Sequence, residues 1–104
     1  MIVEHALLPV RAEHGAAFEN ALREAIPLIA ASPGFLGINV LRPNTQGDPY
    51  LLLVRWADVA SHRDGFRESD RYEQWRDLLH HFYDPVPMVT YFGASVIDSS
   101  PPSA

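Results

Sequence analysis

The first half of the chain begins with a short apolar stretch and continues with a longer amphipathic one. Residues Ile2–Val10 carry apolar side chains at both odd and even positions, which predicts a strand buried on both faces. From Glu13 to about Ala31, apolar residues recur at helical spacing and predict a helix. They are Phe18, Leu22, Ala25, Ile26 and Ile29. Pro27 lacks a backbone N–H and clashes with the preceding turn, so we expect a kink there, or a break near Ala25 and a restart.

Two further strands follow, joined by a loop. The tripeptide Ser32-Pro33-Gly34 predicts a turn, after which Phe35–Arg42 has the alternation of a strand. Residues Pro43–Pro49 contain glycine, asparagine and aspartate and predict a loop. Residues Tyr50–Trp56 predict the second strand. We therefore expect an antiparallel hairpin with a loop longer than the tightest turns.

The second half predicts two helices and a last strand. Asp58 is a suitable N-cap for a short helix, and Ser69 or Asp70 is one for the next helix. The apolar arc of that next helix consists of Tyr72, Trp75, Leu78, Leu79 and Phe82. Pro85-Val86-Pro87 ends the helical region, and the largely apolar Met88–Ile97 predicts the strand.

The order of these elements predicts the fold class. Strand, helix, strand, strand, paired helices and strand give an α+β sandwich of ferredoxin-like type, with an antiparallel sheet and the helices on one face. The strands are apolar on both faces, so we expect a second copy of the chain to cover the other face and form a homodimer, a dimeric α+β barrel. We expect one domain over residues 1–97 and a flexible C-terminal tail over residues 98–104.

The composition narrows the chemistry that such a domain can perform. The 104 residues include no cysteine, and all eight basic residues are arginine. This excludes thiol nucleophiles, thiolate metal sites and Schiff-base lysines. The net charge of −5 argues against a nucleic acid or an anionic membrane as partner. The sequence has neither a leader peptide pattern nor an uncharged run of about 18 residues, so we expect a cytoplasmic protein.

Four short motifs carry a resemblance to a known family. They are the SPGF turn at residues 32–35, the Trp56-Ala57-Asp58 end of a strand, the F-x-x-S-x-x-Y pattern at residues 66–72 and the FYDPVPMV segment at residues 82–89. In this order, from Ile2 to Ile97, the chain resembles the antibiotic biosynthesis monooxygenase (ABM) family. The resemblance implies a dimer of ferredoxin-like domains and, often, oxygenation of aromatic or quinol-like substrates without metal or flavin. We therefore expect no cofactor.

The chain departs from that family at positions that matter in some of its branches. A tryptophan and a histidine of the haem-degrading branch would fall on Phe66 and Trp75, and its first-strand asparagine has no counterpart. These departures argue against haem degradation. An asparagine of the anthrone-oxidising branch would fall on Leu52, and a histidine that similar proteins carry early in the last strand would fall on Tyr91.

His62 is the main candidate for chemistry. It shares one helical face with Val59 and Phe66 and is therefore expected to point inward. An inward histidine with a pKa near neutrality is a natural proton acceptor for a phenol or an enol. The alternative is a half-buried histidine that is hydrogen-bonded to a backbone carbonyl.

Aromatic side chains gather in the second half and are candidates for a wall on which a substrate stacks. They are Trp56, Phe66, Tyr72, Trp75 and Phe82. An aromatic stripe at helical spacing is also what an ordinary core requires, so both interpretations stay open.

Two polar residues are candidates for steadying a substrate oxyanion. Arg55 is the one charge within the apolar run LLLVRW. A buried arginine needs a partner, which is either that oxyanion or a carboxylate across the dimer, such as Glu4. Tyr91 can donate a hydrogen bond to a substrate oxygen or anchor the end of its strand.

The adjacent His80 and His81 do not predict a metal site. Neighbouring residues on a helix point in different directions, and no histidine one turn away completes a ligand set. We expect both to be solvated at the helix end.

These observations and the resemblance favour a cofactor-independent monooxygenase. A base would remove a proton from a small aromatic, quinol-like or polyketide-like substrate in an apolar pocket, and the resulting anion would reduce molecular oxygen directly. We assign the base to His62, the wall to the aromatic residues and the oxyanion contact to Tyr91 or Arg55. The alternatives are a non-catalytic dimeric module, which binds a small apolar ligand or merely assembles, and a haem-degrading monooxygenase.

Overall fold

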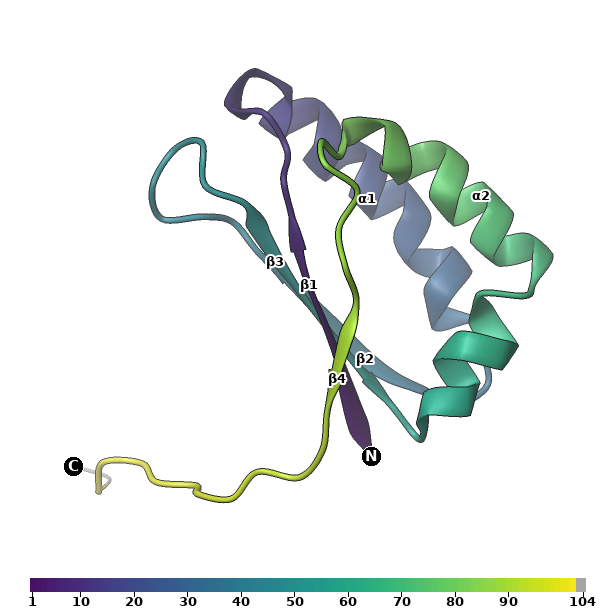
Figure 1. Cartoon of the computed structure of the whole chain (residues 1–104), viewed down its shortest axis with the longest axis vertical. Coiled ribbons are helices and arrows are strands. Elements are labelled where there is room, and N and C mark those ends of the chain that lie inside the picture. Colours follow the sequence, from purple (N-terminus) through teal and green to yellow (C-terminus); the bar gives the residue numbers. More distant parts are fainter. Residues whose placement is uncertain (103–104) are drawn as a thin grey trace.

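The computed structural model describes residues 1–102, and its elements follow one another in the predicted order (Figure 1). The strands are β1 (Ile2–Leu8), β2 (Phe35–Leu41), β3 (Tyr50–Trp56) and β4 (Thr90–Phe92). The long helices are α1 (Gly15–Ala30) and α2 (Asp70–Leu79), and the short ones are η1 (Ala12–His14), η2 (Ser61–Phe66) and η3 (His80–Phe82). This is the ferredoxin-like order, and it confirms the predicted α+β class.

The four strands form one antiparallel sheet in the order β2-β3-β1-β4. Strand β1 pairs with β3 along its whole length and with β4 over Val3–His5, so it lies inside the sheet. An interior strand needs apolar side chains at both parities when both faces of its sheet are covered. The pattern at Ile2–Leu8 therefore fits the position that this strand occupies.

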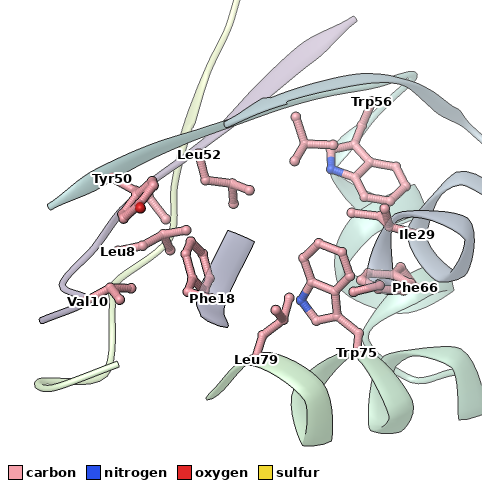
Figure 2. Close-up of a cluster of buried hydrophobic side chains, with 13 residues drawn as sticks. Leu8, Val10, Phe18, Ile29, Tyr50, Leu52, Trp56, Phe66, Trp75 and Leu79 are labelled. Carbon is pink, nitrogen blue, oxygen red and sulfur yellow. The ribbon is translucent and has the colours of Figure 1, made fainter. Parts of the chain in front are cut away.

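Helices α1 and α2 lie side by side on one face of the sheet (Figure 1). Cross-strand partners point to the same face, so Ala6 and its partner Leu52 both face the helices. The core lies between the two layers. Figure 2 shows Trp56, Phe66 and Trp75 gathered on one side of it, with Phe18 on the other. The fully buried members are Trp56, Phe18, Phe66, Ile29, Leu79 and Val54.

The opposite face of the sheet carries no helix within residues 1–102 (Figure 1). Leu7, Leu41 and Phe92 project from it and are 50%, 49% and 56% exposed. Leu51 and Leu53 of β3 share that face and are partly exposed. A single chain therefore leaves an apolar sheet face open, as the doubly apolar strands predict. We call it the open face.

Pro27 does not break α1, contrary to one of the two expectations. The helix is continuous from Gly15 to Ala30. Pro27 is exposed and lies in the last turn, while the neighbouring positions Ala25 and Ile29 are buried. The proline therefore removes one backbone donor at the solvent side, and the buried residues on either side hold the helix to the sheet.

The first and last strands are shorter than predicted. Strand β1 ends at Leu8, and Val10 forms only an isolated bridge with Tyr83. The predicted strand Met88–Ile97 is reduced to Thr90–Phe92. Phe92 pairs with Val3, next to the start of β1, so the residues that follow have almost no partner strand left. They run away from the sheet (Figure 1).

Candidate functional site

A cavity of about 270 Å³ lies between the sheet and the helical layer. Strand β1 supplies one side, η2 and α2 supply another, and the segment after η3 completes it. Its lining combines apolar and aromatic side chains with a few titratable ones. The lining residues are Glu4, Ala6, Leu8, Ile29, Leu52, His62, Phe66, Arg67, Tyr72, Trp75, His80, Tyr83, Val86, Pro87 and Val89.

Glu4 is a buried carboxylate in the middle of β1. The strand alternation that turns Ala6 and Leu8 toward the helices also turns Glu4 there, and its side chain is 6% exposed. The indole Nε1 of Trp56 donates a hydrogen bond of 2.9 Å to Glu4 Oε1. No hydrogen bond from residues 1–102 reaches Oε2, which keeps some accessible surface. Burial raises the pKa of Glu4 above 4.5, although the bond from Trp56 works in the opposite direction.

His62 is held against Glu4 by the local structure of η2. Asp58 Oδ1 accepts hydrogen bonds from the backbone N and the hydroxyl of Ser61, both 2.8 Å, and fixes the start of this turn. The turn is a π-helix, and it points His62 and Phe66 inward together. His62 Nε2 lies 3.4 Å from Glu4 Oε1. Burial lowers the pKa of His62 to about 4, so the ring is neutral at pH 7.

Tyr91 completes a row of three titratable side chains. It pairs with Glu4 across β1 and β4, which places the two side chains on the same face. The distance between Tyr91 Oη and His62 Nδ1 is 2.6 Å. Burial raises the pKa of Tyr91, which remains protonated at neutral pH. When Tyr91 donates to Nδ1, the proton of the neutral ring is on Nε2, facing Glu4.

We call this row the Glu4–His62–Tyr91 chain. Each of its members has a titratable side chain, and the members are linked by contacts of 2.6 and 3.4 Å. Glu4 and His62 reach the cavity, whereas Tyr91 lies behind the histidine ring. Such an arrangement can take a proton from a molecule in the cavity and distribute the charge over neighbouring groups.

Three of the five predicted aromatic residues line the cavity. Phe66 contacts Tyr72 and Trp75 edge to face, with ring centroids 5.4 and 5.7 Å apart. Trp56 lies one layer deeper, with its ring 5.5 Å from that of His62. Phe82 lies away from the cavity, because it packs against Phe18 in the core.

Arg55 lies on the open face, away from the Glu4–His62–Tyr91 chain. It pairs with Val3, so the strand alternation turns it away from Glu4, and its Nη1 donates a 2.8 Å hydrogen bond to Asn39. Arg55 does not line the cavity, so it is not placed to contact a substrate oxyanion there. The alternative partner, a carboxylate across the dimer, stays a prediction. The guanidinium of Arg55 also covers Gly37, where a Cβ would collide with it.

His80 is not the solvated helix-end residue that the sequence predicts. It is half-buried, lines the cavity and lies between the rings of Tyr72 and Tyr83. Burial lowers its pKa. His81 is exposed and stacks on Phe82 at 4.2 Å, which agrees with the expectation for that residue.

Two charged residues of the cavity, Glu4 and Arg67, were not predicted as site residues. Glu4 was considered only as a partner of Arg55, although a carboxylate on the helix-facing parity of an apolar strand was the available signal. Arg67 follows η2 and gave no signal, because an arginine before a helix is ordinarily solvated.

Within residues 1–102 no cluster of histidine and carboxylate side chains could hold a metal ion. The same part of the chain contains no helix that is long and apolar enough to cross a membrane.

Comparison with known proteins identifies the family to which the chain belongs. The family model of antibiotic biosynthesis monooxygenases matches residues 1–78, which is most of the chain. The chain belongs to this family. The fold class that the sequence resemblance implies is confirmed as well.

Two similar proteins are close in length to this chain. The uncharacterized protein YczJ of Bacillus subtilis is 37% identical over 92 residues, which are 88% of this chain and 97% of YczJ. A Bordetella bronchiseptica protein that carries the name of the same family has a crystal structure with a TM-score of 0.85 and 28% identity. The match covers 91% of this chain and 97% of that one.

SnoaB from Streptomyces nogalater, a cofactor-independent oxygenase, shares the fold. Its structure gives a TM-score of 0.72 with 18% identity, over 92% of each chain. At this identity the likeness concerns the fold.

Proposed function

We propose that this ABM protein is a cofactor-independent monooxygenase that acts on a small aromatic, quinol-like or polyketide-like molecule. The observation that carries the proposal is the Glu4–His62–Tyr91 chain at a cavity with aromatic walls. Membership of the ABM family supports it, and so does the shared fold with SnoaB, an oxygenase that works without a cofactor.

The first step is removal of a proton from the substrate. The neutral His62 stabilises the carboxylate of Glu4 through Nε2, and Tyr91 holds the ring in that tautomer. The proton acceptor is thus the carboxylate beside His62, and not His62 itself as the sequence pattern predicts.

The second step is the reaction of the resulting anion with molecular oxygen. The carbanion or enolate transfers one electron to O₂, and the substrate radical and superoxide then combine to a C–O bond. The peroxide takes the proton from Glu4 and becomes a hydroperoxide. Loss of water from an R₂CH–OOH group leaves a ketone, so that R₂CH₂ and O₂ give R₂C=O and H₂O. The substrate supplies all the electrons.

The aromatic wall orients the substrate. Phe66, Tyr72 and Trp75 present edges and faces against which a planar ring stacks. The apolar lining from Leu8, Ile29 and other residues keeps water from the anion, which strengthens the electrostatic interactions around it. Proton removal, orientation and exclusion of water are contributions that the side chains of this cavity can make without a bound group.

Oxygen uptake tests the proposal. The wild type is given a panel of anthrones and quinols in an oxygen electrode, beside Glu4→Gln, His62→Gln and Tyr91→Phe. We expect uptake with some members of the panel and a loss on the order of a hundredfold or more in kcat for Glu4→Gln. The exposed His81→Gln is the matched control and keeps the wild-type rate. Equal rates in wild type and Glu4→Gln would remove the carboxylate from the mechanism.

A second candidate function has one observation in its favour. His62 is already hydrogen-bonded to Tyr91, which is what a non-catalytic module that binds a small apolar ligand would have. This module would bind planar ligands with unchanged affinity in the three variants and consume no oxygen with any of them.

The open face supports a proposal about the partner. Leu7, Leu41 and Phe92 leave an apolar area on a sheet that has no cover within residues 1–102. We assign this face to a second copy of the chain in a homodimer, since a two-fold axis lets one patch cover itself. Light scattering at micromolar concentration should give twice the mass of 11.6 kDa. A monomeric mass would refute the assignment.

A further inference from the structure

Arg67 differs from every other arginine of the chain. The other seven each form a salt bridge within 4 Å or a side-chain hydrogen bond. Their partners are Asp84 for Arg11, Glu19 for Arg23 and Arg42, Asn39 for Arg55, Asp64 for Arg63, Ser32 for Arg71 and Asp77 for Arg76. Within residues 1–102, Arg67 has no such partner. The unpaired arginine is also the one that lines the cavity.

The fold fixes where Arg67 stands. Its backbone N donates a 2.9 Å hydrogen bond to the carbonyl of His62, which places the residue one turn after the histidine. Its side chain is exposed, and its guanidinium lies over the ring of Tyr72, 5.8 Å from the centroid. The charge is therefore held against the aromatic wall at the mouth of the cavity.

Two charged side chains of opposite sign line the cavity, and burial raises the pKa of Glu4 while the positive charge of Arg67 lowers it. Glu4 is an acceptor at the buried end, where burial already disfavours its ionised form. Arg67 is the sole arginine that lines the mouth, and the half-buried His80 lines the same cavity and can donate a hydrogen bond. A ligand with one anionic group avoids repulsion from Glu4 when that group lies at Arg67.

We propose that the ligand of this cavity is an aromatic carboxylate, whose carboxylate pairs with Arg67 while the ring lies against Phe66, Tyr72 and Trp75. The proposal rests on the proposed function only for the orientation of the ligand. In that orientation the acidic C–H or O–H group of the ligand lies at Glu4. A guanidinium and a carboxylate form two parallel hydrogen bonds, which favour this anion over a neutral group of the same shape. Arg67 is then a specificity-determining residue.

A pair of planar probes tests the inference by binding alone. The probes are 2-naphthoate and its neutral isostere 2-naphthamide, titrated by calorimetry at pH 7.5 into wild type, Arg67→Gln, Arg67→Lys and Arg63→Gln. Arg63 is exposed, lies in the same turn and serves as the matched control. We expect the wild type to prefer 2-naphthoate by about tenfold, because its carboxylate forms two charged hydrogen bonds with the guanidinium and the neutral amide does not. Arg63→Gln keeps this preference, Arg67→Lys keeps part of it and Arg67→Gln loses it.

The possible results separate this inference from the proposed function. An equal preference in wild type and Arg67→Gln overturns the role of Arg67, and so does the absence of binding of either probe at millimolar concentration. An intact preference combined with no oxygen uptake by the wild type overturns the monooxygenase and leaves the carboxylate site standing. A wild-type preference that disappears in 0.5 M salt supports the ion pair.

Discussion

The buried, neutral His62 makes a specific prediction about stability and pH. Its pKa is about 4 in the folded protein and about 6.5 in the unfolded chain. Below pH 6.5 the unfolded chain therefore binds a proton that the folded protein does not bind, and stability falls as the pH falls. The loss ends below about pH 4, where both states are protonated.

The magnitude follows from these two pKa values. When the pH is lowered from 7 to 4.5, this difference in pKa reduces the free energy of unfolding by about 2 kcal/mol. Glu4 acts in the opposite direction, because its raised pKa lets the folded protein keep a proton that the unfolded chain loses above pH 4.5. Both proteins to be compared therefore carry Glu4→Gln, which removes this second titration and keeps the acceptor for Trp56.

The assay is urea unfolding at pH 7.0, 5.5 and 4.5, followed by tryptophan fluorescence at one fixed protein concentration. The difference in unfolding free energy between Glu4→Gln and Glu4→Gln/His62→Gln is expected to shrink by about 2 kcal/mol across this range. His80 also has a lowered pKa, but it is present in both proteins and cancels in the difference. A difference that stays constant with pH, or grows as the pH falls, would refute the description of His62 as a buried neutral ring.

Three further substitutions test the fold. Pro27→Ala should raise the free energy of unfolding by about 1 to 2 kcal/mol, because alanine restores a backbone donor at an exposed helical position; a lower melting temperature would contradict this. Gly34→Ala should lower it by about 2 kcal/mol or more in urea unfolding, since Gly34 has φ = 83° and a Cβ there would collide with Ser61. Leu53→Asp on the open face should give a monomer in light scattering and leave the circular dichroism of the fold unchanged; a persistent dimer would move the interface elsewhere.

Much of the fold can be predicted from the sequence because strand alternation and helix caps are local signals. Strand β3 has the predicted bounds, since its alternation coincides with alternating burial from Tyr50 to Trp56. The predicted caps are also confirmed: Asp58 binds the start of η2, and the hydroxyl of Ser69 accepts from the backbone N of Tyr72. The error at the last strand has another origin, because the length of β4 depends on where its partner β1 begins.

The candidate site could be predicted only in part. The inward direction of His62 follows from its one-turn spacing to Phe66, which is a local property. The contact with Glu4 joins residues 58 positions apart and depends on the register of β1 and on the position of η2, neither of which leaves a pattern in the sequence. Arg55 illustrates the same limit: the alternation of its strand is visible in the sequence, but the whole sheet decides which side of the strand faces the helices.

Burial also explains why the Glu4–His62 pair is suited to proton transfer and is more than an internal ion pair. In water, a histidine binds a proton more tightly than a glutamate by about two pKa units. In this cavity burial removes that difference, because it lowers the pKa of His62 to about 4 and raises that of Glu4. An imidazolium that neutralised Glu4 would leave the carboxylate a weak base. A neutral ring 3.4 Å away leaves Glu4 available to take a proton from a substrate and to return it in a later step.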